Sequence, residues 1–263
     1  MSPRPSWTAV RSELSRTNFA GRRVTLAEGV GVVAGCTVLT ALRGRPVDTL
    51  TVLGIGTLGL VDDILEHRQR QRDGARVVKG LRGHLRALRE LRPTTGGAKL
   101  VGIPILCTVA AATAPATRVV LLDGALAAGT ANLANLLDLR PGRALKVLLP
   151  GAALLALPAT DDERQRSGRD AAIAVLTVGA AVLPLDLREH GMLGDGGANT
   201  LGAVLGIALA RRLPVPARVL LLAGVVALTV ASEKVSFSAV IASHPVLASL
   251  DALGRRPPSQ EGP

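Results

Sequence analysis

Apolar residues gather in eight long segments that are separated by short polar connections. The segments cover residues 25–42, 47–61, 99–116, 118–137, 145–158, 171–187, 198–212 and 215–232. A helix needs about 20 residues to cross the hydrocarbon core of a bilayer, so the shorter segments must borrow flanking residues or lie in a thinned region. The pattern predicts an all-α, polytopic membrane helix bundle with about eight transmembrane helices.

Composition and charge agree with a multi-pass protein of the cell membrane. Hydrophobic residues make up 48% of the 263 residues, and the formal net charge is +11. In a soluble protein this charge would suggest nucleic acid, but here most of the 31 Lys and Arg residues fall in alternate connections. By the positive-inside rule, those connections and both termini are cytoplasmic. We therefore expect the lipid bilayer, and no nucleic acid, as a partner.

The chain is expected to form one transmembrane domain over residues 25–242. A basic, polar N-terminal arm (1–24), without the apolar centre of a signal peptide, precedes it, and a cytoplasmic tail (243–263) with a disordered end follows. The one long connection, 62–98, is basic. Within it, Leu and Arg recur at helical spacing over 81–92, which predicts an amphipathic helix on the membrane surface that binds either anionic headgroups or substrate. Residues 94–97 are expected to break this helix before Lys99.

Two adjacent carboxylates, Asp62 and Asp63, stand where segment 47–61 ends. Charged side chains are costly inside hydrocarbon, and adjacent carboxylates repel each other unless a cation lies near them. Magnesium bound to phosphate would supply that cation. The alternative is a solvated helix end that happens to carry two acids.

Polar residues recur every third position at the end of segment 118–137. Asn132, Asn135 and Asp138 would share one helix face, which is expected to point into the bundle. This face could bind a polar ligand, or it could form hydrogen bonds between helices.

A fourth acid, Asp195, lies among glycines in Met192-Leu-Gly-Asp195-Gly-Gly. Glycines allow phosphates to approach the backbone, and a helix that begins near Ala198 would offer free amides to an anion. Magnesium usually takes one or two carboxylates, so four acids on one face suggest that some act as a base or bind substrate.

The ordered set of these motifs resembles the polyprenyl-phosphate N-acetylhexosamine-1-phosphate transferase superfamily, which includes the phospho-N-acetylmuramoyl-pentapeptide transferases. The segments Asn18-Phe-Ala-Gly21-Arg22 and Lys79-Gly-Leu-Arg-Gly-His84 resemble those of short actinobacterial-type members. The resemblance implies transfer of a sugar 1-phosphate from a UDP-sugar to polyprenyl phosphate, with release of UMP. It also implies Mg²⁺, or Mn²⁺, as cofactor and an active site at the cytoplasmic face; a homodimer is compatible with it.

The resemblance also assigns roles to residues. Asp195 would ligate magnesium and act in catalysis with Asp62 and Asp63, one of which would deprotonate or orient the lipid phosphate. The residues expected to bind substrate are Asn132, Asn135, Asp138, Lys79, His84 and Lys99.

The chain departs from the best-known members in two motifs. Pro141 stands where they carry a further acid, and Glu233-Lys234 together with the single His244 stands where they carry a histidine-rich motif. These differences motivate a second hypothesis, a catalytically silent relative that binds the lipid carrier or an envelope-assembly partner. A transporter is a third hypothesis, but the acids of a transporter would be expected to form a chain across the bilayer, whereas these acids gather at one face.

Overall fold

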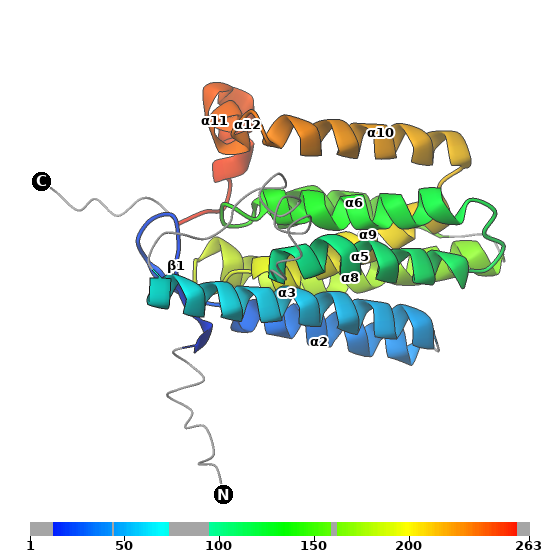
Figure 1. Cartoon of the computed structure of the whole chain (residues 1–263). Coiled ribbons are helices and arrows are strands. Elements are labelled where there is room, and N and C mark those ends of the chain that lie inside the picture. Colours follow the sequence, from blue (N-terminus) through cyan, green and yellow to red (C-terminus); the bar gives the residue numbers. More distant parts are fainter. Residues whose placement is uncertain (1–12, 44, 74–94, 159–161, 257–263) are drawn as a thin grey trace, which may run out of the picture.

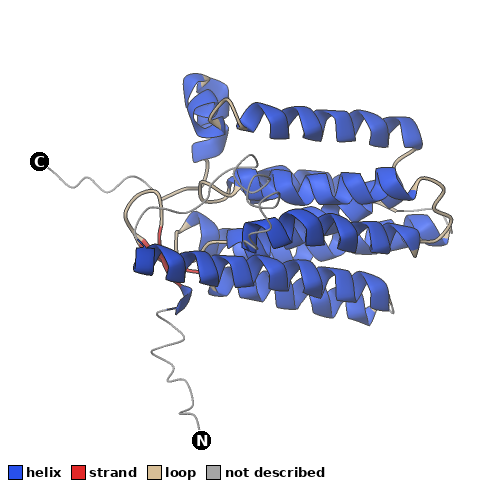
Figure 2. Ribbon diagram, viewed as in Figure 1, coloured by secondary structure: helices blue, strands red, loops and turns tan. Residues whose placement is uncertain are grey.

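The computed structural model describes residues 13–43, 45–73, 95–158 and 162–256 (Figure 1). Within these ranges the chain forms ten helices and one small two-stranded sheet (Figure 2). The strands are β1 (Ser15–Thr17) and β2 (Arg23–Thr25), and the helices are α2 (Ala27–Leu42), α3 (Pro46–Asp73), α5 (Thr95–Ala112), α6 (Val120–Leu137), α7 (Arg143–Leu155), α8 (Glu163–Leu187), α9 (Gly194–Arg212), α10 (Val215–Ser232), α11 (Phe237–Ser243) and α12 (Pro245–Ala252). The all-helical prediction is therefore confirmed, apart from the small sheet.

Each of the eight apolar segments falls largely on one helix between α2 and α10. Three of these helices, α6, α8 and α10, are long and apolar enough to cross a membrane. Helix α2 and residues 96–112 of α5 are apolar but shorter. These helices indicate a membrane-associated protein.

Helix α9 lies inside the bundle and packs against α2, α3, α6 and α8 (Figure 1). Its small residues allow this close approach. A Cβ added at Gly202 would lie 2.6 Å from the carbonyl oxygen of Thr130, and one at Gly206 would lie 2.5 Å from Cα of Ala127. Small residues at helix interfaces are the usual means by which membrane helices pack backbone to backbone.

Helix α10 lies at the edge of the bundle, where it packs mainly against α6 (Figure 1). Of its residues, only Arg218 and Val225 are buried. Helices α11 and α12 follow it and have no buried residues. They are held to the bundle by Asp251, which accepts hydrogen bonds from the Arg143 guanidinium at 2.8 and 2.9 Å.

Several predicted boundaries were wrong. Helix α3 continues to Asp73, so Asp62 and Asp63 lie within a helix, because the following polar residues are good helix formers even though they are not apolar. Helix α5 begins at Thr95, so Gly96 and Gly97 belong to its first turn. Helix α9 begins at Gly194, four residues before the predicted start, because packing against α3 overrides the low helix propensity of its glycines.

The chain after residue 243, predicted to be a tail, forms α12 and continues in described structure to residue 256. Its last residues, 257–263, lie outside the described residues, as do the predicted amphipathic helix at 81–92 and the candidate site residues Lys79 and His84.

The small sheet is a hairpin that was not predicted. Ser15 pairs with Thr25 and Thr17 with Arg23, in antiparallel register. The Asn18 side chain closes the turn by accepting hydrogen bonds from the backbone N–H groups of Ala20 (2.9 Å) and Arg22 (3.0 Å), while Gly21 takes a positive φ of 74°. This side-chain-to-backbone bonding is typical of asparagine in turns.

Candidate functional site

Helices α3, α5 and α9 bring three acids and one lysine together at one end of the bundle. Lys99 forms ion pairs with both Asp62 and Asp195, through its Nζ and one carboxylate oxygen of each. Asp62 and Asp63 come from α3, Asp195 from the first turn of α9, and Lys99 from the first turns of α5. We call this end of the bundle the site end.

Glycines make this approach of α3 and α9 possible. A Cβ at Gly59 would lie 2.5 Å from the Asp195 carbonyl oxygen, and one at Gly196 would lie 2.6 Å from Cδ2 of Leu60. Gly194 has a positive φ of 60°, and a Cβ there would lie 2.8 Å from Oδ2 of Asp63. The first turn of α9 therefore rests directly on α3, which brings Asp195 beside the two acids of that helix.

The Asp63 carboxylate lies at the N-terminus of α9. Its Oδ2 accepts a hydrogen bond from the Gly196 backbone N–H at 3.2 Å, and the Asp195 backbone N–H also donates to this carboxylate. Asp63 follows the apolar part of α3, which ends at Val61. Burial raises the pKa of Asp63 to about 7, and the negative charge of Asp195 acts in the same direction, while the two backbone hydrogen bonds oppose both. Asp63 can therefore exchange a proton near neutral pH.

The polar residues at the end of α6 make contacts of two different kinds. Asn132 donates from Nδ2 to Oγ1 of Thr229 on α10, at 3.2 Å, so this side chain does form a hydrogen bond between helices. Asp138 caps the other end of the motif and accepts a hydrogen bond from the Gly194 backbone N–H. Burial raises the pKa of Asp138 well above its ordinary value, and the nearby charges of Asp186 and Glu28 raise it further.

A pocket of about 410 Å³ connects Lys99 with the asparagines of α6. The polar side chains that line it are Lys99, Asn132, Asn135, Asn199, Thr229, Ser232 and Glu233. Its apolar residues include Ile103 and Pro104 of α5 and Ala128 of α6, which lie farther from the site end along their helices. The volume is that of a small-molecule site, and its lining could hold a ligand with one polar and one apolar part.

Three further polar residues at the site end were not predicted. Asn199 lines the pocket and donates from Nδ2 to the Asp195 carbonyl oxygen at 2.7 Å. Asp186 is buried and accepts a hydrogen bond from the Gly142 backbone N–H at 2.9 Å. Glu28 is buried, and neither of its carboxylate oxygens has a hydrogen-bond partner among the described residues. The signal that could have found Glu28 and Asp186 is an acid inside an apolar segment.

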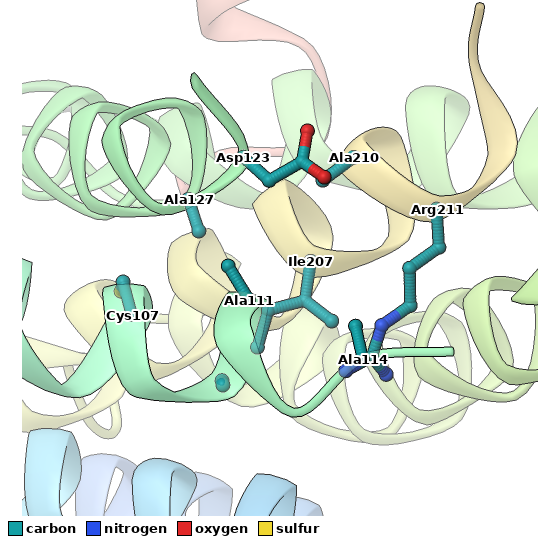
Figure 3. Close-up of a pocket in the computed structure, with 9 residues that line it drawn as sticks. Cys107, Ala111, Ala114, Asp123, Ala127, Ile207, Ala210 and Arg211 are labelled. Carbon is teal, nitrogen blue, oxygen red and sulfur yellow. The ribbon is translucent and has the colours of Figure 1, made fainter. Parts of the chain in front are cut away.

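The opposite end of the bundle carries a second group of charged residues. Arg211 binds both oxygens of Asp48, at 2.6 and 2.7 Å, and Asp123 accepts from Arg164 at 3.1 Å and from Arg218. Figure 3 shows Asp123 and Arg211 around a small cavity of about 10 Å³. A cavity of this size has room for about one water molecule, whereas the pocket that Lys99 lines has the volume of a small-molecule site.

The acids of the site carry donors of the chemical kind that magnesium prefers. Carboxylate oxygens are the ligands that this ion prefers, and a diphosphate-bound ion needs only one or two of them. Among the described residues, no group of three or more His, Cys, Asp or Glu side chains is arranged to hold a metal ion. In this arrangement, the Lys99 ammonium is the cation between Asp62 and Asp195.

No protein-family model matches the chain, and the comparisons with curated proteins and with solved structures also find no match.

Proposed function

We propose that the protein is a membrane transferase that moves an N-acetylhexosamine 1-phosphate from a UDP-sugar to polyprenyl phosphate, with release of UMP, in cell-envelope glycan synthesis. The observation that carries this proposal is the ion-paired group of Lys99, Asp62 and Asp195 beside a pocket with polar and apolar walls. A phosphorylated lipid has a polar phosphate and an apolar chain, which match the polar and apolar walls of that pocket.

The proposal has all eight helices from α2 to α10 crossing the membrane, with the site end and both termini cytoplasmic. Consecutive helices alternate in direction (Figure 1), which supports this topology. The arginines of the opposite end also fit it, because five of them are paired with acids and so offer little net positive charge. These pairs are Arg43 with Asp170, Arg45 with Glu163, Arg211 with Asp48, and Arg164 and Arg218 with Asp123.

The pocket supports a lipid acceptor because of where its walls lie. Helix α10, which forms one wall, packs mainly against α6, and its surface is apolar and exposed along most of its length. The pocket could therefore receive part of a prenyl chain between α5 and α10, while the lipid phosphate lies near Lys99. Asn135, Asn199 and Glu233 line the same pocket and would hold the nucleotide sugar.

The proposed reaction is an in-line phosphoryl transfer. An oxygen of the lipid phosphate attacks the β-phosphorus of the UDP-sugar, a new P–O bond forms, and the bond to the bridging oxygen breaks as UMP leaves with its electron pair. Such reactions depend on positioning and on neutralising charge. Lys99 would neutralise phosphate charge, and magnesium, when bound through Asp195, would neutralise more of it.

Asp63 is the better candidate for the proton acceptor of the two adjacent acids. Asp62 is already engaged by the Lys99 ammonium, whereas Asp63 has no ion pair among the described residues, and burial raises its pKa to about 7 despite its backbone hydrogen bonds. In this assignment Asp63 takes the remaining proton from the lipid phosphate, and Asp62 holds Lys99 in place.

A catalytically silent relative is the second candidate. The ion pairs of Lys99 favour it, since this side chain takes the position between two acids where a metal would otherwise be expected. Such a protein would bind the lipid carrier without consuming a nucleotide sugar.

The test is purified protein with magnesium, polyprenyl phosphate and a panel of nucleotide sugars, scored for UMP and for labelled lipid. We expect turnover with a UDP-N-acetylhexosamine, and more than about a hundredfold loss in each of Asp62→Asn, Asp63→Asn and Asp195→Asn. If lipid binds but no donor is turned over, the silent relative replaces the transferase. Wild-type rates in all three variants would overturn the site.

A further inference from the structure

The N-terminal hairpin, residues 15–25, contacts both chain segments that carry the acids of the site. We infer that it is a clamp that positions Asp195 relative to Asp63, through Arg22 and Asn18 on one side and Arg16 on the other. Its consequence for catalysis rests on the proposed function, but the clamp itself does not. Arg22, Asn18 and Glu189 are positioning residues in this inference, since none of them contacts the acids directly.

On the first side, the hairpin holds the turn formed by residues 188–193, which leads into α9. Glu189 in this turn has a positive φ of 58°, a conformation that residues other than glycine rarely adopt without support. Its buried carboxylate binds the Arg22 guanidinium through both oxygens, with Nε to Oε2 at 2.7 Å, and it also accepts from Nδ2 of Asn18. A forked arginine bond of this kind fixes orientation as well as charge.

The backbone of the hairpin extends this contact. Thr25 forms a parallel bridge with Gly191, and its carbonyl oxygen accepts from the Met192 N–H at 3.0 Å. Gly191 has no room for a side chain, because a Cβ there would lie 2.6 Å from Oε2 of Glu28. The turn is thus held by backbone and side chains at once, only a few residues before Asp195.

On the second side, Arg16 reaches α3. Its Nη2 donates to the carbonyl oxygen of Asp63 at 2.7 Å, and its Nη1 donates to the carbonyl oxygens of Glu13 and Ser15 at 2.7 and 2.8 Å. The guanidinium therefore ties the main chain of α3 at Asp63 to the start of β1. The hairpin thus links α3 to the turn before α9, so loosening it should let Asp195 move relative to Asp63.

The experiment is backbone hydrogen exchange of the substrate-free protein in detergent micelles. We expect Glu189→Gln and Arg22→Gln to speed exchange in residues 189–199 by at least about tenfold, above all at the Met192 and Gly196 amides, with α6 unchanged. The double variant should be no faster than the single variants, because both break one interaction. Glu163→Gln, which breaks the exposed Arg45 pair at the opposite end, is the matched control and should leave this region unchanged.

Unchanged exchange in Glu189→Gln would overturn the clamp, and so would faster exchange spread evenly over the whole chain.

A second experiment, which measures activity, separates this inference from the proposed function. In an active protein, Glu189→Gln should lower kcat about tenfold with less than about a twofold change in KM for the nucleotide sugar, since it misplaces acids without removing contacts to the sugar. Arg22→Lys, which keeps the positive charge, should retain a higher kcat than Arg22→Gln. If the variants change exchange locally but the protein has no transferase activity, the clamp inference stands and the proposed transferase function is rejected.

Discussion

The two ends of the helix bundle differ in how many of their buried acids are paired with a basic side chain. At the opposite end, Asp48 and Asp123 are matched by arginines from neighbouring helices, and the cavity lined by Asp123 and Arg211 has room for about one water. The site end also has matched pairs, such as Glu189 with Arg22, but there Lys99 pairs with both Asp62 and Asp195. Further acids close by have no ion pair among the described residues. Those further acids are Asp63, Asp138, Asp186 and Glu28.

This difference distinguishes acids that stabilise the fold from acids that are available to a ligand. A buried charge whose partners come from the protein needs nothing else, so the arginine pairs tie helices together. A surplus of buried acids is costly unless a cation or a proton neutralises it, so their presence points to a ligand. The larger pocket is lined by Lys99, which pairs with two acids of the site end, and none of the residues that pair at the opposite end lines it.

The largest effect is expected at the opposite end. Asp48→Asn leaves the Arg211 guanidinium buried without its counter-ion, which should lower the free energy of unfolding by about 3–5 kcal/mol. The double variant Asp48→Leu/Arg211→Met removes both charges and should recover most of that loss. The measurement is unfolding in mixed detergent micelles. A cost below about 1 kcal/mol for Asp48→Asn would mean that these pairs are not structural.

At the site end, Lys99→Met should lower the activity rather than the stability. It removes the cation shared by Asp62 and Asp195, so we expect more than about a hundredfold loss of sugar phosphate transfer. Lys146→Met is the matched control, because Lys146 donates only to the carbonyl oxygens of Leu250 and Asp251 among the contacts described for it, and it should retain near wild-type activity. Equal rates in the two variants would remove Lys99 from the site.

A smaller effect is expected from Gly59→Ala. The added Cβ would lie 2.5 Å from the Asp195 carbonyl oxygen, so the first turn of α9 must move away from α3. Displacements of this size can cost one or two orders of magnitude in rate, and we expect a loss of about tenfold. Gly31→Ala, where a Cβ would meet nothing within 4 Å, is the control. Full activity in Gly59→Ala would show that the approach of the two helices does not matter.

The sequence predicted the helical segments well because a long apolar run has few other stable forms. It placed Asp62, Asp63 and Asp195 as a group, and the structure does bring them together, with Lys99 between two of them. Hydrophobicity marks where the bilayer would end and not where a helix ends, which is why the extension of α3 to Asp73 was missed.

Other features depend on contacts between distant parts of the chain. Strands of three residues carry almost no periodic signal, so the hairpin formed by β1 and β2 could not be predicted, although Asn18 and Gly21 are ordinary turn residues. Glu28 and Asp186 lie in separate helices more than a hundred residues apart. Only the folded bundle places both of them near Asp138.

The central claim is that the acids around Lys99 at the site end act on a ligand, while the arginine-paired acids Asp48 and Asp123 at the opposite end hold the fold. Its most direct test compares Asp195→Asn with Asp123→Asn by UMP release per folded molecule, in the presence of magnesium, polyprenyl phosphate and a UDP-N-acetylhexosamine. We predict that Asp195→Asn loses more than about a hundredfold while remaining as stable as the wild type. Asp123→Asn should be less stable but should keep its rate per folded molecule. Equal losses of rate in the two variants would contradict the account.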